Sequence, residues 1–277
     1  MRTENMRRDA QNTVYLIVHA DDIGMCHSVN KTTIEAYERG VISSGSIMVP
    51  CPWFLEAAEY FRKHPELDVG IHITLTSEWK LYRWPPVAPK NEVPGLIDNY
   101  GFMYRTSKEV AEHATGKEVE TEIRAQIERA LEFGIKPTHL DTHMGTVHFK
   151  PEFLETYVRL AEEFGIPVLL HRGPPELVEK ASSLVREMPR VVGISEIKNF
   201  DERKSEYIKM LENLKPGVNE VILHLGGDDE EIRAIIGQDA HLRYKDFLIF
   251  SDTEIKRAIQ TLGLNLIGWR NLRRSSP

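Results

Sequence analysis

Short apolar runs recur along the chain, and the segments between them carry apolar residues at helical spacing. Each run is rich in Val, Ile and Leu and is bounded by turn residues, which is typical of a buried strand. The predicted strands cover residues 14–18, 44–49, 68–75, a short stretch ending before 138, 167–170, 191–194, 219–225 and 264–269. The pattern therefore predicts a chain of repeated strand and helix units.

The helical segments differ in how regular their apolar stripes are. Helices are predicted at residues 30–40, 53–62, 107–133, 151–164 and 205–214, and the segment 107–133 is the most regular of them. A last helix is expected to run to about residue 262, with Ser251 as its N-cap and Glu254 completing a capping box. Between 226 and 250 the pattern is polar and irregular, apart from a helical turn or two at 230–236.

The alternation of strands and helices decides the fold class. It favours an α/β fold, a distorted (β/α) TIM-like barrel, with a doubly wound open sheet as the alternative. No change of composition marks a linker, so a single domain is expected over 1–277, and residues 1–12 of it are expected to form an N-terminal arm. An aromatic insertion at 76–105 is expected near the site, where its rings could stack on sugars or pack onto the body, in its own or a neighbouring chain.

Composition limits the classes of binding partner and the cellular compartments that are expected for this protein. The chain is 41% hydrophobic and 28% charged with a formal net charge of −7, and no basic stripe stands out, so nucleic acid is not an expected partner. Cys26 and Cys51 are too few for a disulfide framework. The polar N-terminus and the lack of a long apolar run predict no signal peptide and no membrane span, hence a cytoplasmic protein. The number of subunits stays open, a homodimer included.

Carboxylates and histidines gather where the predicted strands end. These residues are Asp21, Asp22, His72, His139, Asp141, His143, His171 and His224. In a barrel the carboxyl ends of the strands open on one face, where active sites are built. An Asp pair can simply cap a helix, and a single histidine is more often structural than a ligand. Several of them at corresponding strand ends instead indicate one site.

One carboxylate and two imidazoles form a ligand set suited to a single divalent ion, Zn, Mn, Co or Mg. Such an ion generates a nucleophilic water and polarises a carbonyl. An adjacent carboxylate can take the proton of that water, and a histidine on the opposite side can protonate a leaving amine. This chemistry is amide hydrolysis with Asp21 and His224 as the acid–base pair. The alternatives are a barrel metalloenzyme that hydrolyses a phosphoester or isomerises a sugar derivative, and a non-catalytic sugar-binding barrel.

Three stretches together resemble the signatures of the YdjC-like carbohydrate deacetylases, which include chitooligosaccharide deacetylases and the deacetylase of hopanoid biosynthesis. They are Val-His-Ala-Asp-Asp-Ile-Gly at 18–24, Val-Gly-Ile-His-Ile-Thr-Leu at 69–75 and Lys-Pro-Thr-His-Leu-Asp-Thr-His at 136–143. The resemblance covers nearly the whole chain in order and spacing. It implies a distorted (β/α) barrel that removes acetyl groups from N-acetylated amino sugars with one divalent ion, Mg or Zn before Mn or Co.

The resemblance also implies a role for each matching residue. Asp22, His72 and His143 would hold the metal, Asp21 would be the base and His224 the acid. His139 and Asp141 would orient the ligands or lie in the core, and His148 and Arg172 are expected to contact the substrate or the ligands. The chain departs from the family pattern at four places: His19, Ile23, the stretch 144–148 and Leu225. These changes surround the substrate, so they bear on its identity more than on the reaction.

Overall fold

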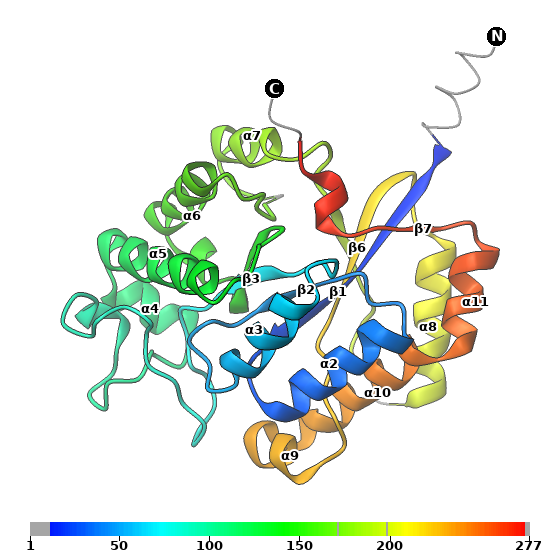
Figure 1. Ribbon diagram of the computed structural model, residues 1–277, viewed down its shortest axis with the longest axis horizontal. Helices are drawn as coiled ribbons and strands as arrows, with labels where there is room; N and C mark the ends of the chain where they lie inside the picture. Colours follow the sequence, from blue (N-terminus) through cyan, green and yellow to red (C-terminus); the bar gives the residue numbers. More distant parts are fainter. Residues whose placement is uncertain (1–11, 171, 198, 275–277) are drawn as a thin grey trace.

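The structure is a computed structural model that describes residues 12–170, 172–197 and 199–274, and it contains a parallel sheet with helices around it (Figure 1). Six strands follow in the order β4-β3-β2-β1-β6-β5, and β7 pairs with the first residues of β1. All the ladders are parallel. The strands are β1 (Val14–Ile23), β2 (Ser44–Ile47), β3 (Gly70–Ile73), β4 (Leu140–Thr142), β5 (Arg190–Val192), β6 (Gly217–Leu223) and β7 (Asn265–Leu266).

The sheet curves into an incomplete barrel. At one end β4 is extended by a single bridge from Leu140 to Val168, and at the other end lies β5. Among the described residues no ladder joins Val168 to β5, so a seam stays open between these two elements. The predicted α/β fold with a distorted barrel is confirmed in this half-barrel form.

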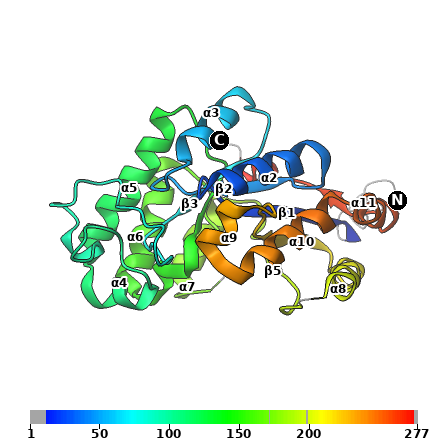
Figure 2. The ribbon, with the colours of Figure 1, turned by 90° about the horizontal axis from the view of Figure 1, so that it is seen from below.

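Helices surround the sheet on its outer side (Figures 1 and 2). They are α2 (His27–Arg39), α3 (Phe54–Lys63), α4 (Ser107–His113), α5 (Gly116–Glu132), α6 (Pro151–Phe164), α7 (Pro175–Ser183), α8 (Phe200–Glu212), α9 (Glu230–Ile236), α10 (Ala240–Ser251) and α11 (Thr253–Thr261). Short 3₁₀ segments lie at Pro94–Leu96, His143–Phe149, Gly237–Asp239 and Trp269–Leu272. No helix in the described part of the chain is long and apolar enough to cross a membrane.

The strand β1 shows how the sequence separates core from site. Leu16, Val18 and Ala20 belong to a buried cluster that includes helix residues such as Phe250. The intervening residues face the other side of the sheet, because side chains alternate along a strand. There Ile17 packs with Trp269, and the positions that follow are the polar His19 and Asp21. The interior of the barrel is therefore apolar at the start of β1 and polar toward its end.

The single helix predicted at 107–133 is wrong. The segment forms α4 and α5, which are separated at Ala114 and Thr115. Each helix starts with a complete capping box, Thr106 with Glu109 and Thr115 with Glu118. Two capping boxes satisfy the first N–H groups of two separate helices, and this outweighs the continuous apolar stripe.

Four other predictions need correction. The strand at 167–170 is reduced to the bridge at Val168, and the strand at 264–269 to the two residues of β7. The N-cap of α11 is Asp252, whose side chain accepts from the Glu254 N–H, and not Ser251. The segment 226–250 holds α9 at the predicted place and also the unpredicted helix α10. A buried Asp246, paired with Arg203, interrupts the apolar pattern of α10.

The aromatic insertion packs mainly onto the body of the protein. Apart from the short Pro94–Leu96 turn it has no regular helix. Trp84 is fully buried and donates through Nε1 to the Thr76 carbonyl at 2.9 Å, and the Tyr82 hydroxyl donates to the Met25 carbonyl at 2.7 Å. Tyr100 is 84% exposed. Of the two uses considered for these rings, packing therefore accounts for Trp84 and Tyr82.

Candidate active site

The end of β1 is distorted so that two adjacent carboxylates reach one site. Asp22 has φ 64°, in the left-handed region, and the register between β1 and β2 shifts between Ala20 and Ile23. This conformation is unfavourable for most residues because Cβ approaches the next carbonyl oxygen. Adjacent strand residues normally point to opposite faces. The distortion brings Asp21 Oδ2 to 3.9 Å and Asp22 Oδ1 to 3.6 Å from the same atom, His72 Nε2.

Asp22, His72 and His143 form a buried group with converging ligand atoms. Asp22 Oδ1 lies 3.2 Å from His143 Nδ1 and 3.6 Å from His72 Nε2. Within the described part of the chain this oxygen has no hydrogen-bond partner, although it is buried. A buried carboxylate oxygen without a partner is costly. A divalent cation between the three atoms would neutralise it.

A carboxylate holds the remaining nitrogen of each imidazole. His72 Nδ1 is 2.8 Å from Asp141 Oδ1, and His143 Nε2 is 3.1 Å from Glu78 Oε2. When these nitrogens donate to the carboxylates, the other nitrogen of each ring carries the lone pair and faces Asp22. Metal-binding histidines are commonly oriented in this way. Asp141, which was predicted to orient the ligands or to lie in the core, thus contacts His72, and Glu78 makes the corresponding contact with His143.

Asp21 contacts a different set of groups. Its Oδ1 lies 3.0 Å from His19 Nε2 and 3.3 Å from the Ser46 hydroxyl, while Oδ2 lies 3.7 Å from His224 Nε2. The His224 side chain is 49% exposed, so it connects the buried carboxylate with the outside. His224, the predicted acid, was expected on the side of the site opposite Asp21, the predicted base, whereas the structure places the two side chains next to each other.

Two further histidines, His19 and His139, are fully buried behind these groups. His19 Nε2 is 3.1 Å from Asp141 Oδ2 in addition to its contact with Asp21. Burial alone would lower the pKa of His19, but Asp141 and Asp21 outweigh it and raise that pKa well above its usual range. The ring of His139 stacks on Trp269 with centroids 4.7 Å apart, and burial lowers the pKa of His139. His19 is therefore a charged link between two carboxylates, and His139 belongs to the core.

The electrostatics keep Asp22 charged. Burial alone would raise the pKa of Asp22, but Arg243, followed by His143, outweighs it and holds the pKa well below its usual range. Burial would likewise lower the pKa of His143, yet Glu78 and Asp22 raise it to about 10. A metal ligand must be neutral imidazole, so metal binding at His143 has to release a proton.

Three groups of side chains have atoms close enough together to hold an ion, and they differ in how well they could bind one. They are His19 with His139 and Asp141, Asp22 with His72 and His143, and Asp21 with His72 and Asp141. In the first and third groups the Asp141 carboxylate already accepts from Ser46, His19 and His72. Only the second group combines an unpartnered carboxylate oxygen with two imidazole nitrogens oriented by other carboxylates.

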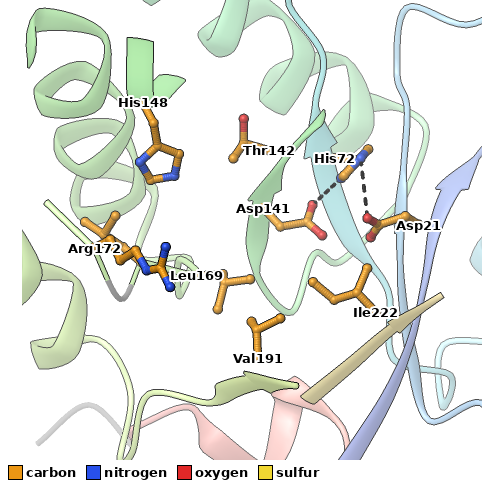
Figure 3. Close-up of a pocket in the computed structure, with 10 residues that line it drawn as sticks. Asp21, His72, Asp141, Thr142, His148, Leu169, Arg172, Val191 and Ile222 are labelled. Carbon is orange, nitrogen blue, oxygen red and sulfur yellow. Dashed lines mark hydrogen bonds and ion pairs between the residues drawn. The ribbon is translucent and has the colours of Figure 1, made fainter. Parts of the chain in front are cut away.

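A cavity of about 440 Å³ opens beside this group at the seam of the barrel (Figure 3). Asp21, His72 and Asp141 line one end of it, and His148 and Arg172 lie at the other end. The rest of the lining consists of Thr142, Leu169, Leu170, Val191 and Ile222. The cavity has the size of ordinary small-molecule sites and a mixed polar and apolar lining.

The structure thus brings together Asp21, Asp22, His72, His143 and His224, with Asp141 behind them. His139 lies in the core, and His148 and Arg172 line the cavity away from the ligand atoms. His171 lies outside the described residues.

Sequence reasoning missed Glu78 and Arg243 and noted His19 only as a departure. Glu78 lies in the aromatic insertion rather than directly after β3, and Arg243 lies in a segment without a readable pattern, so no local signal pointed to either residue.

Comparison with known proteins shows the family of this chain. The family model of the YdjC-like proteins matches residues 15–261. A carbohydrate deacetylase of Thermus thermophilus is 30% identical over 93% of this chain and 93% of its own length. A carbohydrate deacetylase of Thermoanaerobacter pseudethanolicus is 27% identical over 94% of this chain and 99% of its own length.

Among solved structures, a crystal structure from Enterococcus faecalis V583 superposes with a TM-score of 0.80 at 26% identity. The superposition covers 95% of this chain and 100% of that one, which was provisionally described as a cellobiose-phosphate cleavage protein. The family model, the long relatives and the shared fold all cover nearly the whole chain. The chain belongs to the YdjC-like family.

Proposed function

We propose that this protein hydrolyses the N-acetyl group of an acetylated amino sugar or oligosaccharide with the help of one divalent metal ion. The observation that carries the proposal is the convergence of Asp22 Oδ1, His72 Nε2 and His143 Nδ1, with an unpartnered oxygen and two oriented imidazoles. The names of the full-length relatives, both carbohydrate deacetylases, support the substrate class.

The ligand set fits a divalent ion that favours mixed nitrogen and oxygen donors, with Mg or Zn expected before Mn or Co. When bound, such an ion supplies a Lewis acid that polarises a carbonyl and lowers the pKa of a water. Asp22, His72 and His143 would hold it, while Asp141 and Glu78 contact the two imidazole rings on their other nitrogens. Asp22, His72 and Asp141 lie in β1, β3 and β4, His143 directly follows β4, and Glu78 lies in the insertion after β3.

Asp21 is the general base in this proposal. Its Oδ1 is fixed by His19 and Ser46, which leaves Oδ2 to accept the proton of the attacking water. A base held on one side keeps its other oxygen oriented toward the reaction.

His224 is the general acid. Its Nε2 lies 3.7 Å from Asp21 Oδ2, so a proton taken up by Asp21 has only a short distance to travel to the imidazole. The half-exposed ring can then donate to the leaving amine. Because the base and the acid are neighbours, the proton that Asp21 takes from the attacking water can pass to His224 and then to the leaving amine.

The cavity at the seam is the proposed sugar site. It adjoins Asp21 and His72, and its aliphatic residues offer a surface for the apolar face of a sugar ring. His148 and Arg172 at its far end are proposed to contact polar substituents of the substrate (Figure 3).

The test is acetate release from a panel of N-acetylated mono- and oligosaccharides, with each of Mg²⁺, Zn²⁺, Mn²⁺ and Co²⁺ added to chelator-treated protein. Acetate is expected from at least one sugar with at least one ion. The Asp21→Asn variant serves as the matched control, because it should bind the ion without releasing acetate. Release by the variant at the wild-type rate would contradict the proposal.

A further inference from the structure

A single arginine contacts the candidate ligand Asp22 from the side opposite the histidines. Arg243 Nη2 donates to Asp22 Oδ2 at 2.7 Å, while Oδ1 of the same carboxylate faces His72 and His143. Asp22 is 1% exposed and the Arg243 side chain 12%, so the pair is well shielded from water. The two oxygens of Asp22 therefore have separate partners.

We propose that Arg243 is a positioning residue that holds Asp22 as a metal ligand through one oxygen. The inference rests on the proposed metal centre. A carboxylate on a short side chain can rotate and bind an ion through one oxygen or through both. With Oδ2 fixed by a charged hydrogen bond, only Oδ1 is free to face the ion.

The surroundings of Arg243 favour this role over a purely structural one. Its Nη1 is buried and has no hydrogen-bond partner among the residues that the structure describes. A buried arginine that serves stability alone is expected to have a partner for each nitrogen. Arg203 does, because Nε and Nη2 donate to Asp246 at 2.6 and 2.7 Å and Nη1 donates to the Ile197 carbonyl at 3.4 Å. Arg243 leaves a donor unused beside the site, which is the kind of compromise found at functional positions.

The position of Arg243 also connects the ligand with the segment that carries the acid. A Cβ at Gly226, two residues after His224, would lie 3.2 Å from Arg243 Cβ and 3.5 Å from its Cδ. The stem of the arginine thus packs directly on the backbone that follows His224. Through Arg243, α10 therefore contacts both Asp22 and the backbone segment that follows His224.

The test is a Co²⁺ titration of the metal-free full-length protein, followed by visible absorption. Arg243→Met should weaken Co²⁺ binding by about 10- to 100-fold, which is the usual effect of removing a group that orients a ligand. Its Co²⁺ absorption should also weaken, because a carboxylate free to bind through both oxygens raises the coordination number. Arg243→Lys keeps one charged donor and should recover part of the affinity.

The control is Arg203→Met, which removes the partner of a buried aspartate on the same helix α10 but away from the site. It should lower thermal stability and leave Co²⁺ affinity and absorption within about twofold of wild type. Where the Met variants fail to fold, Arg243→Lys and Arg203→Lys form the same comparison.

The outcomes separate two claims. A wild-type protein that binds no Co²⁺ would overturn the metal centre and, with it, the role of Arg243. Wild-type affinity and absorption in the Arg243 variants, next to a wild type that does bind, would overturn the inference alone.

Discussion

The two halves of the barrel contribute differently to the site. The half from β1 to β4 supplies the candidate ligands and the base, all at or just after strand ends. The half from β5 to α10 supplies His224 and Arg243, which contact the carboxylates of the first half. One half thus presents the candidate metal ligands, and the other half contributes side chains that contact the carboxylates of the first half.

The difference shows in the local geometry. In the first half each ligand histidine has a carboxylate on its far nitrogen, Asp141 or Glu78. In the second half His224 is half exposed and Arg243 reaches in from a helix. Variants in the first half should therefore affect metal binding, and variants at His224 should affect turnover.

The largest effect is expected from removing a ligand. His72→Ala or His143→Ala should lower metal affinity by more than the roughly 10- to 100-fold that orienting residues contribute, and abolish activity. Elemental analysis of the purified protein gives the metal content directly. His64→Ala, an exposed histidine that pairs with Glu66, is the control and should keep its metal. Unchanged stoichiometry in both ligand variants would remove these histidines from the site.

Next in size is the separation of the adjacent carboxylates. Asp21→Asn should lower kcat by about 10²- to 10⁴-fold, the usual contribution of a general base, and retain the metal. Asp22→Asn should lose the metal. Both activity and metal content are measured on each variant. If the two variants behave alike, the division of roles between Asp21 and Asp22 is wrong.

A smaller effect is expected in the second half of the barrel. His224→Gln should lower kcat toward the lower end of the same range of about 10²- to 10⁴-fold, because water can reach this half-exposed position and supply the proton. Metal content should stay at the wild-type level. If His224→Gln lost its metal but kept its turnover per bound ion, the second half of the barrel would contribute to metal binding and not to turnover, which contradicts the proposed division.

The last effect concerns stability rather than activity, at a carboxyl group remote from the candidate ligands. Glu122 is buried and accepts from the Val87 and Ala88 N–H groups, which ties the aromatic insertion to α5. Burial raises its pKa from 4.5 to about 7. A raised pKa in the folded state means that the stabilisation is fully present below about pH 4.5 and is lost as the pH rises through 7.

The loss can reach on the order of 3 kcal/mol for this group. Urea unfolding at pH 5 and pH 8 measures it, and Glu122→Gln, which does not titrate, should lose less stability between these values than wild type does. An equal loss in both proteins would show that Glu122 does not titrate in this range.

Much of the first half could be predicted from the sequence. Buried parallel strands read as apolar runs, and the polar residues that end them follow directly in the chain. The pattern therefore placed Asp21, Asp22, His72 and His143 in one larger strand-end group, and the family resemblance assigned their separate roles. Glu78 escaped because its role depends on how the insertion folds back over His143. The sequence does contain a second Thr-x-x-Glu capping box at Thr115, but the apolar stripe continues across it and favoured a single helix.

The second half was harder for physical reasons. Helix α10 carries a buried ion pair between Asp246 and Arg203, so its apolar pattern is interrupted. The contact of Arg243 with Asp22 joins residues far apart in the chain, and no local pattern encodes it. The left-handed conformation of Asp22 is likewise set by its surroundings, because Asp has no strong preference for it.

The central claim is that Asp22, His72 and His143 hold the ion, and one measurement tests it directly. Anomalous X-ray diffraction from crystals grown with Zn²⁺ or Mn²⁺ locates the ion among the three groups of side chains that could bind it. The account predicts one anomalous peak between Asp22 Oδ1, His72 Nε2 and His143 Nδ1. A peak between His19, His139 and Asp141, or between Asp21, His72 and Asp141, would contradict it.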